Sequence, residues 1–281
     1  MTDANPDDTA PPDAEDIEVE LFIEALRRAH GYDYSGYLRA SFKRRLQALA
    51  ARKQAPDISS LTGRLLRDPA LLPDIIAGLS VPHSGMFRDP GVFARLRGEV
   101  LPALASHPRL TVWHAGCAGG EEAYSLAIVL HELGLIRRSR IYATDISDGI
   151  LALAREGIYP LREARQYAEN YLAAGGTASF SDYMHAQYGG IKMHDWLRAP
   201  MTFATHNLTV DGVFVEAQLV ICRNVFIYFD TALRRRALQL FADSLVRGGY
   251  LLIGLREAVD RELVMRWFEP LGDGLYRRLS T

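Results

Sequence analysis

Residues 109–145 read RLTVWHAGCAGGEEAYSLAIVLHELGLIRRSRIYATD, and their pattern indicates the class of fold. RLTVWHAG is typical of a strand that runs into a glycine turn, GEEAYSLAIVLHELG of a helix, and RIYATDIS of a second strand. The second strand ends at Asp145, where a carboxylate can meet the two hydroxyls of a ribose. This layout is that of an adenosine-binding half-domain. A tight turn with a surface aspartate is the alternative, because the stretch is not a full G-x-G-x-x-G.

The segments that follow continue the alternation of strands and helices. VEAQLVICRNV is typical of a strand, TALRRRALQLFADSLVRGG of a helix, and YLLIGL of a further strand. The alternation predicts a doubly wound α/β domain with a mostly parallel sheet, and we expect it to span residues 91–281. Residues 176–202 interrupt the rhythm with tyrosine, histidine and glycine, and predict a small antiparallel β insertion.

The first part of the chain has a different character. Residues 17–80 show only helical signals, such as the apolar spacing of IEVELFIEALRRAHG, and predict a small all-helical domain. Residues 1–16 are rich in proline and aspartate and predict a disordered acidic tail. Proline, glycine and serine in LSVPHSGMFRDP indicate that residues 81–90 link the two domains.

The composition excludes several classes of protein. The chain has 281 residues with a net charge of −2, which gives no nucleic-acid signal. No apolar run approaches the roughly 18 residues of a membrane helix, so we expect no membrane insertion. The two cysteines, Cys117 and Cys222, fit a reducing compartment, and we expect a cytoplasmic protein. The eight histidines show no metal-ligand spacing, so we expect no metal.

Two acidic residues, Glu121 and Glu122, follow the glycine turn directly. A dinucleotide pyrophosphate would sit at this helix N-terminus and would be repelled by them. A sulfonium nucleoside has no phosphate, and it carries positive charge at its sulfur and at its ammonium group. This contrast favours S-adenosylmethionine over NAD as the cofactor. The alternative is that both glutamates only complement the helix dipole.

The sequence resembles the CheR family of chemoreceptor glutamate methyltransferases over about residues 17–281. The motifs that carry the resemblance occur in the family's order: SGYLRASFKRRLQALAARK, MFRDPGVFARLRGEVLPAL, GGEEAYSLAI, IYATDIS, ALAREGIYP, HNL and ICRNVFIYFD. The resemblance implies a Rossmann-like S-adenosylmethionine methyltransferase domain, an N-terminal helical domain and a β insertion. It also implies methyl transfer to glutamate side chains of methyl-accepting chemotaxis proteins, with S-adenosylhomocysteine as the second product.

The resemblance implies functional residues by their place in these motifs. Catalytic roles at the methyl-transfer site fall on Arg88 in MFRDP and on Tyr228 in FIYFD. The implied cofactor contacts are Ser84, Arg88, Glu122, Asp145, Asn207, Leu208, Arg223 and Asn224. Each position has a plainer alternative, such as a surface arginine, the end of a strand, or core packing in the case of Tyr228. We assign no chemistry to His114 or Cys117.

The sequence departs from the family's pattern at the predicted cofactor edge. Residues 81–88 read VPHSGMFR, where Asn-Thr-Thr or Val-Thr-x-Phe usually precedes the Phe-Arg pair. Pro82 removes a donor and Gly85 loosens the loop. The glycine turn reads GCAGGEEAYS where AxxTGEEPYS is usual. These departures motivate a second hypothesis, a regulatory module that binds S-adenosylmethionine or S-adenosylhomocysteine with weak or no catalysis.

The placement of charge indicates a docking surface. Residues 1–20 hold eight acidic residues and no basic one, whereas residues 35–54 hold six basic residues and no acidic one. The family uses this region to meet acidic receptor helices, so the resemblance implies docking through Arg39, Lys43, Arg44, Arg45 and Arg52. The alternative for this surface is a solvated helix face, and the alternative for the substrate is another acidic protein, a different protein or a small molecule. We expect no nucleic-acid partner, because few aromatics lie among the charges, and we expect a monomer.

Overall fold

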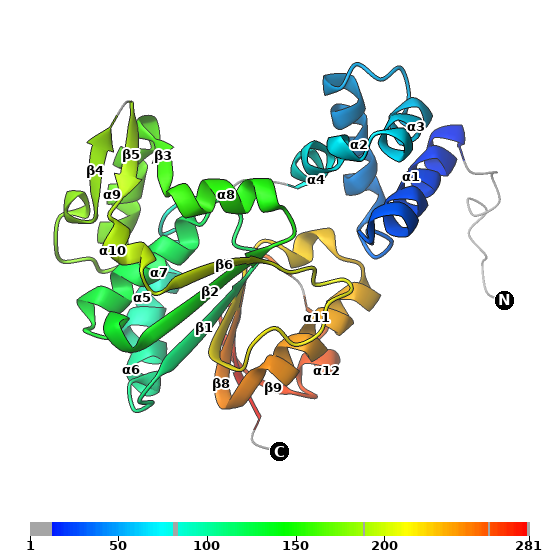
Figure 1. Ribbon diagram of the computed structural model, residues 1–281. Helices are drawn as coiled ribbons and strands as arrows, with labels where there is room; N and C mark the ends of the chain where they lie inside the picture. Colours follow the sequence, from blue (N-terminus) through cyan, green and yellow to red (C-terminus); the bar gives the residue numbers. More distant parts are fainter. Residues whose placement is uncertain (1–12, 81–83, 188, 258, 280–281) are drawn as a thin grey trace. The chain divides into compact units, whose positions relative to one another are not determined.

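The computed structural model describes residues 13–80, 84–187, 189–257 and 259–279 (Figure 1). The chain divides into two compact units, Met1–Leu79 and Ser80–Thr281. The first unit is helical and the second is built on a mixed sheet. Within the described ranges, the helices are too short or too polar to span a bilayer.

The first unit packs its helices around apolar side chains at helical spacing. Its elements are α1 (Ala14–His30), α2 (Arg39–Arg52), α3 (Ile58–Arg67), η1 (Pro69–Leu71) and α4 (Leu72–Leu79). Phe22 and Leu26 of α1 and Phe42 and Leu46 of α2 are fully buried. Asp57 starts α3 by accepting a hydrogen bond from Ser60 N (2.6 Å). The predicted all-helical N-terminal domain is confirmed.

The second unit contains a seven-stranded sheet in the order β6-β2-β1-β7-β8-β10-β9. Its strands are β1 (Leu110–Ala115), β2 (Ser139–Asp145), β6 (Met201–Thr205), β7 (Ala217–Cys222), β8 (Leu245–Ile253), β9 (Phe268–Gly272) and β10 (Leu275–Arg278). The first five in this spatial order run parallel, and β10 pairs antiparallel with both β8 and β9. Strand order reverses at β1, which lies between β2 and β7. The predicted Rossmann-like α/β fold is confirmed. Sheets of this kind bind ligands at the carboxyl ends of the strands near the point where the strand order reverses, which here is the carboxyl end of β1.

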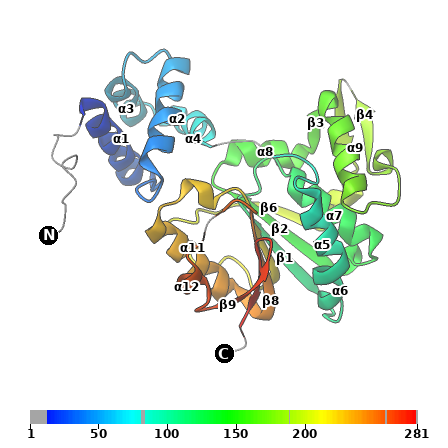
Figure 2. The same cartoon turned by 180° about the vertical axis from the view of Figure 1, so that it is seen from behind.

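Helices cover both faces of this sheet (Figures 1 and 2). One face carries α5 (Pro90–Arg95), the π-helical turn η2 (Leu96–Val100), α6 (Leu101–Leu104) and α7 (Glu121–Glu132), and the other carries α11 (Thr231–Ser244) and α12 (Arg261–Val264). Trp113 of β1 packs against Phe241 of α11 with ring centroids 5.5 Å apart. Val112, its neighbour on the opposite face, lies in the core with Leu126 of α7. Apolar residues on both faces explain why the strand reads as a nearly continuous apolar run.

The insertion is a three-stranded antiparallel sheet in the order β3-β5-β4. Its strands are β3 (Ile158–Pro160), β4 (Met184–Gln187) and β5 (Gly190–Met193), and the neighbouring elements in the chain are η4 (Leu161–Glu163), α9 (Ala164–Ala173), η5 (Phe180–Tyr183) and α10 (Asp195–Arg198). The helix before the insertion, α8 (Asp148–Glu156), packs against β2 and β6 of the large sheet, and η3 (Ile136–Arg138) precedes β2. β4 and β5 fall within the range predicted for the insertion, but β3 precedes it and β6, which starts at Met201, belongs to the large sheet. Three residues are too few for β3 to show alternation in the sequence.

Candidate active site

The carboxyl edge of the parallel strands begins with the glycine turn after β1. The N–H groups of Gly116 and Cys117 donate to Thr144 O of β2 at 2.8 and 2.9 Å. Gly116 has φ +75°, and a Cβ there would lie 2.5 Å from a methyl group of Val225. Gly120, just before α7, has φ +86°. The turn therefore requires glycine at both positions, which lets its backbone approach a ligand closely.

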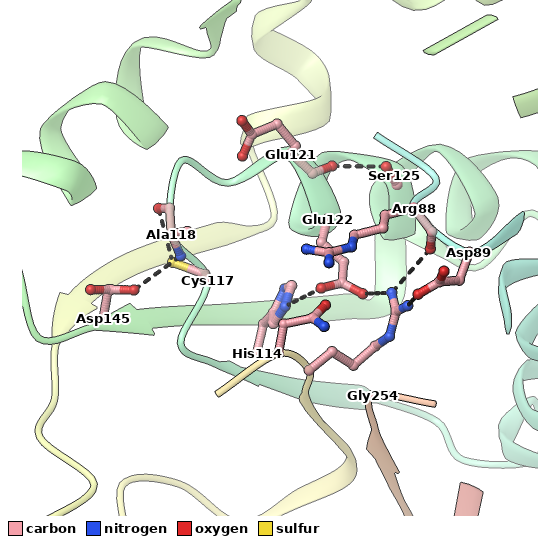
Figure 3. Close-up of polar contacts among 12 residues, drawn as sticks. Arg88, Asp89, His114, Cys117, Ala118, Glu121, Glu122, Ser125, Asp145 and Gly254 are labelled. Atoms are coloured by element: carbon pink, nitrogen blue, oxygen red, sulfur yellow. Dashed lines mark hydrogen bonds and ion pairs between the residues drawn. The ribbon is translucent and has the colours of Figure 1, made fainter. Parts of the chain in front are cut away.

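Asp145 lies at the end of β2 and is bonded to the same turn (Figure 3). Its carboxylate accepts hydrogen bonds from Ala118 N (3.0 Å) and Ser147 N (3.2 Å). Burial raises the pKa of this carboxyl, and the backbone donors oppose the rise. The side chain remains partly exposed, so its free lone pairs can accept further hydrogen bonds, such as those of two ribose hydroxyls.

A buried network of charges is centred on Glu122, in the first turn of α7. One carboxylate oxygen pairs with Nη1 of Arg223, and the other lies 3.2 Å from Nε2 of His114. Arg223 directly follows β7, its side chain is 0% exposed, and its Nη2 pairs with Asp89. Burial alone would raise the pKa of Glu122, but the charge of Arg223 and the contact with His114 outweigh it and hold the pKa at about 2. The site therefore contains a fixed, anionic carboxylate.

The MFRDP segment, residues 86–90, is held at the same edge. Three side chains distant in sequence form hydrogen bonds with its backbone. Ser125 Oγ accepts from Phe87 N (2.9 Å), Asn170 Nδ2 donates to Met86 O (3.0 Å), and Arg223 Nη1 donates to Arg88 O (3.2 Å). Phe87 and Asp89 have φ of +52° and +55°, a region that such residues seldom adopt. The tertiary contacts offset this strain. In Figure 3 the half-buried side chain of Arg88 points toward Glu122.

The remaining predicted cofactor residues lie in loops at this edge. Ser84 is hydrogen-bonded to the carboxylate of Glu121, whose pKa is raised by burial. Residues 81–83, which hold much of the departure from the family's pattern, lie outside the described residues. Asn207 follows β6 and accepts hydrogen bonds from N (3.0 Å) and Oγ1 (2.7 Å) of Thr209, and Leu208 is buried. The contacts shape the loop, and the cofactor roles of these residues stay predictions.

Asn224 and Tyr228 lie in the segment after β7. Asn224 has φ +62° and is half-buried. Tyr228 closes the one-turn helix η6 (Phe226–Tyr228), and its N–H donates to Val225 O at 3.0 Å. Phe226 is fully buried whereas Tyr228 is half-buried, so the two aromatics are not equivalent core residues. The catalytic role of Tyr228 stays a prediction.

Several members of the site were not predicted from the sequence. His114, to which no chemistry was assigned, is 1% exposed and contacts Glu122. Strand alternation could have found it, because His114 shares a face of β1 with Val112, the face that α7 covers. Asp89 was adjacent to a predicted residue but carried no separate signal. Glu257 follows the apolar run YLLIGL by two residues, which is the place where strands of such a sheet present polar groups.

The five predicted docking side chains of α2 fall into two groups. Lys43 is engaged by the start of α1, with carboxylate oxygens of Asp16, Glu15 and Asp13 at 2.7, 3.0 and 3.7 Å from its Nζ. Arg45 is half-buried and donates to Leu79 O at 2.6 Å. Arg39, Arg44 and Arg52 are exposed, although Arg39 lies 3.9 Å from a carboxylate oxygen of Glu20 and Arg52 donates to Gly78 O at 3.4 Å. Lys43 and Arg45 are the more buried of the five side chains, so the exposed arginines are the better docking candidates.

The family of the chain follows from comparisons with known proteins. Residues 17–80 match the family model described as the all-alpha domain of CheR methyltransferases, and residues 82–272 match that of their SAM binding domain. The protein Cher3 of Pseudomonas putida is 46% identical over 256 residues, which cover 91% of this chain and 94% of that protein. A chemotaxis protein methyltransferase of Listeria innocua is 31% identical over 248 residues, with 87% and 92% covered. One of Borreliella burgdorferi is 32% identical over 210 residues, with 70% and 71% covered. The chain therefore belongs to the CheR family of S-adenosylmethionine-dependent methyltransferases.

Proposed function

We propose that this chain is a protein-glutamate O-methyltransferase that methylates glutamate side chains of chemoreceptors. The observation that carries the proposal is the fixed backbone of the MFRDP segment, residues 86–90. Its backbone is fixed by side chains from α7, α9 and the end of β7, so that Arg88 is presented beside Glu122. Membership of a family whose relatives are named chemotaxis protein methyltransferases supports the same assignment.

The residues at this edge fit S-adenosylmethionine. Asp145 offers a partly exposed carboxylate for the ribose, and Glu121 and Glu122 give the start of α7 a negative character. Opposite charge favours an ammonium and a sulfonium there, whereas a pyrophosphate would be repelled. The loop residues Asn207 and Leu208 are proposed to flank the adenine. When bound, S-adenosylmethionine supplies the methyl group.

The proposed acceptor needs no general base. A glutamate side chain has a pKa of about 4.3, so near pH 7 it is already an anionic nucleophile. One of its oxygens forms the bond to the methyl carbon, while the electron pair of the carbon–sulfur bond passes to sulfur. A methyl ester and S-adenosylhomocysteine result, and no proton has to move.

The protein's own contribution is alignment and exclusion of water. Positioning of this kind removes roughly 7–11 kcal/mol of barrier in favourable cases. We assign Arg88 to orienting the carboxylate of the acceptor or of the cofactor, and Tyr228 to donating a hydrogen bond at the same site. A tight ion pair between Arg88 and the acceptor carboxylate would make that carboxylate a weaker nucleophile. We therefore propose that Arg88 orients the carboxylate without pairing tightly with it.

The proposed partner is an acidic helical segment of a receptor. The exposed arginines Arg39, Arg44 and Arg52 of α2 offer positive charge to such a segment. Membrane association would then come only through the receptor. Both cysteines of the chain are free and buried, in keeping with the cytoplasmic location that we propose.

The test is transfer of radiolabelled methyl from S-adenosylmethionine to membranes of the source cell. We expect labelled protein whose label is released by mild base, because methyl esters hydrolyse there. The Arg88→Ala variant is the control for label that does not come from the site. If the wild type binds cofactor but labels no acidic protein, the regulatory binding module replaces this proposal. Base-stable label would indicate a different acceptor group.

A further inference from the structure

A buried carboxylate outside the predicted site lies in the loop after β8. Glu257 is 9% exposed, and its oxygens accept hydrogen bonds from the N–H groups of Gly254 (2.6 Å), Asn224 (2.8 Å) and Ile227 (3.2 Å). Gly254 follows β8 whereas Asn224 and Ile227 follow β7, and these strands are parallel neighbours. Glu257 therefore ties together the carboxyl ends of two adjacent strands at the edge that forms the candidate site.

The segment that Glu257 holds needs such support. Asn224 has φ +62°, in the left-handed region that residues other than glycine seldom adopt. The residue before it, Arg223, is anchored by its buried ion pairs, and the segment ends in Tyr228 at the close of η6. Glu257 binds the N–H of the strained residue and an N–H inside η6. The course of the backbone between Arg223 and Tyr228 is thereby fixed at two further points.

The arrangement suits an ionised carboxylate. Burial raises the pKa of Glu257, and the surrounding backbone N–H groups oppose the rise. Three donors converge on two oxygens, and a protonated carboxyl would turn one of these acceptors into a donor. The packing is also close, because a Cβ on Gly254 would lie 2.5 Å from a carboxylate oxygen of Glu257 and 3.2 Å from Asn224 N.

We propose that Glu257 is a positioning residue that fixes the side chains of Asn224 and Tyr228 through the backbone of residues 224–227. The inference rests on the proposed function, in which Tyr228 acts on the reacting groups, and on the cofactor contact that the family resemblance implies for Asn224. Glu257 then controls cofactor affinity and turnover through these two residues. A role in stability alone would leave both quantities unchanged in the folded protein.

The first test is a double-mutant cycle on binding of S-adenosylhomocysteine, measured by calorimetry. Glu257→Gln keeps the size of the side chain but turns one acceptor into an NH2 group that faces backbone donors. We expect it to raise Kd about tenfold, the effect of one lost hydrogen bond to a charged group. Asn224→Gly keeps the left-handed backbone and removes the amide. In that background the same change should raise Kd only about twofold, because the two residues act together.

The matched control is Glu132→Gln, at the far end of α7. Glu132 also accepts hydrogen bonds inside the protein, including one from the hydroxyl of Tyr183 (2.9 Å). The Glu132→Gln variant should have a lower melting temperature and an unchanged Kd for S-adenosylhomocysteine. If Glu257→Gln does not fold, Glu257→Asp, which keeps the charge on a side chain one methylene shorter, is measured in the same cycle.

Two results would overturn the inference: an unchanged Kd in folded Glu257→Gln, or an equal rise in Kd with and without the Asn224 side chain. Binding of S-adenosylhomocysteine needs no acceptor protein, so this outcome is independent of whether glutamate is methylated. On a receptor fragment, Glu257→Gln should also lower kcat, and by a smaller factor when Tyr228 is already phenylalanine.

Discussion

Replacing Asp145 by alanine tests the cofactor site most directly. The carboxylate accepts two backbone hydrogen bonds, from Ala118 N (3.0 Å) and Ser147 N (3.2 Å), and its exposed part is the proposed ribose contact. Loss of a charge-assisted hydrogen bond to the ligand costs about 1–3 kcal/mol. At about 1.4 kcal/mol for each factor of ten, Asp145→Ala should weaken S-adenosylmethionine binding by about 5- to 150-fold.

The same substitution also disturbs the glycine turn, and the effect must be separated from ligand contact. Ala118 has φ +46°, and without Asp145 its N–H loses its carboxylate partner. Loss of a hydrogen bond to a charged group costs about 1.5–3 kcal/mol of stability, or a melting-temperature shift of about 3–12 °C at 2–4 °C per kcal/mol for a unit of this size. Asp145→Asn keeps an amide oxygen for one backbone donor, and should fall between the wild type and the alanine variant in both measurements.

The matched control is Asp148→Ala, three residues further on. Asp148 is exposed at the start of α8 and accepts a hydrogen bond from the hydroxyl of Thr205. Calorimetry at 25 °C should give the wild-type Kd for this variant. A folded Asp145→Ala variant with wild-type affinity would rule out the ribose contact, and equal losses of affinity in both variants would rule out a specific role for Asp145 at the end of β2.

Three further predictions follow from the site and the helical unit. Reversing Arg39 and Arg44 to glutamate should raise KM for an acidic receptor fragment several-fold and leave cofactor Kd unchanged, and added salt should weaken the wild-type reaction as exposed charges are screened. Tyr228→Phe should lower kcat about tenfold with little change in cofactor Kd. Arg88→Ala should lower kcat strongly, and Arg88→Lys should not restore it fully, because an ammonium group lacks the planar fork of a guanidinium. The pKa of Glu122 lies at about 2 in the folded protein against 4.5 ordinarily, so its contribution to stability is present above pH 4.5 and is lost as the pH falls toward 2. Urea unfolding of wild type and Glu122→Gln across this range should show a difference in free energy that shrinks in acid, by about 3 kcal/mol. A difference that does not depend on pH would contradict the buried ion pair.

The local pattern of the sequence was enough to predict the strands, turn and helix at the edge of the sheet where the cofactor is proposed to bind. An apolar strand, a glycine turn, an acidic helix start and a second strand ending in Asp145 are each read from neighbouring residues, and all were found where they were expected. The carboxyl ends of parallel strands meet at one edge of a sheet, so a pattern read along the chain also predicts proximity in space. The motif order was sufficient to identify the family.

The partners within the site were decided only by the tertiary structure. Arg223 joins Glu122, 101 residues earlier, and Asp89, 134 residues earlier. Strand alternation can assign His114 to a face of β1 but cannot name its partner, and Glu257 reaches back to a segment 30 residues before it. Periodicity carries information over only a few residues. Ion pairs between residues this far apart in the sequence depend on how the strands are ordered in the sheet, which periodicity does not specify.

The two remaining differences have the same origin. Strand β3 is only three residues long, and it becomes a strand by pairing with β5 rather than by its own pattern. The charged residues of helix α2 are all basic, yet Lys43 is held by carboxylates at the start of α1. Composition gives the charge of a helix, but which charges remain available to a partner depends on the packing of the helices around it.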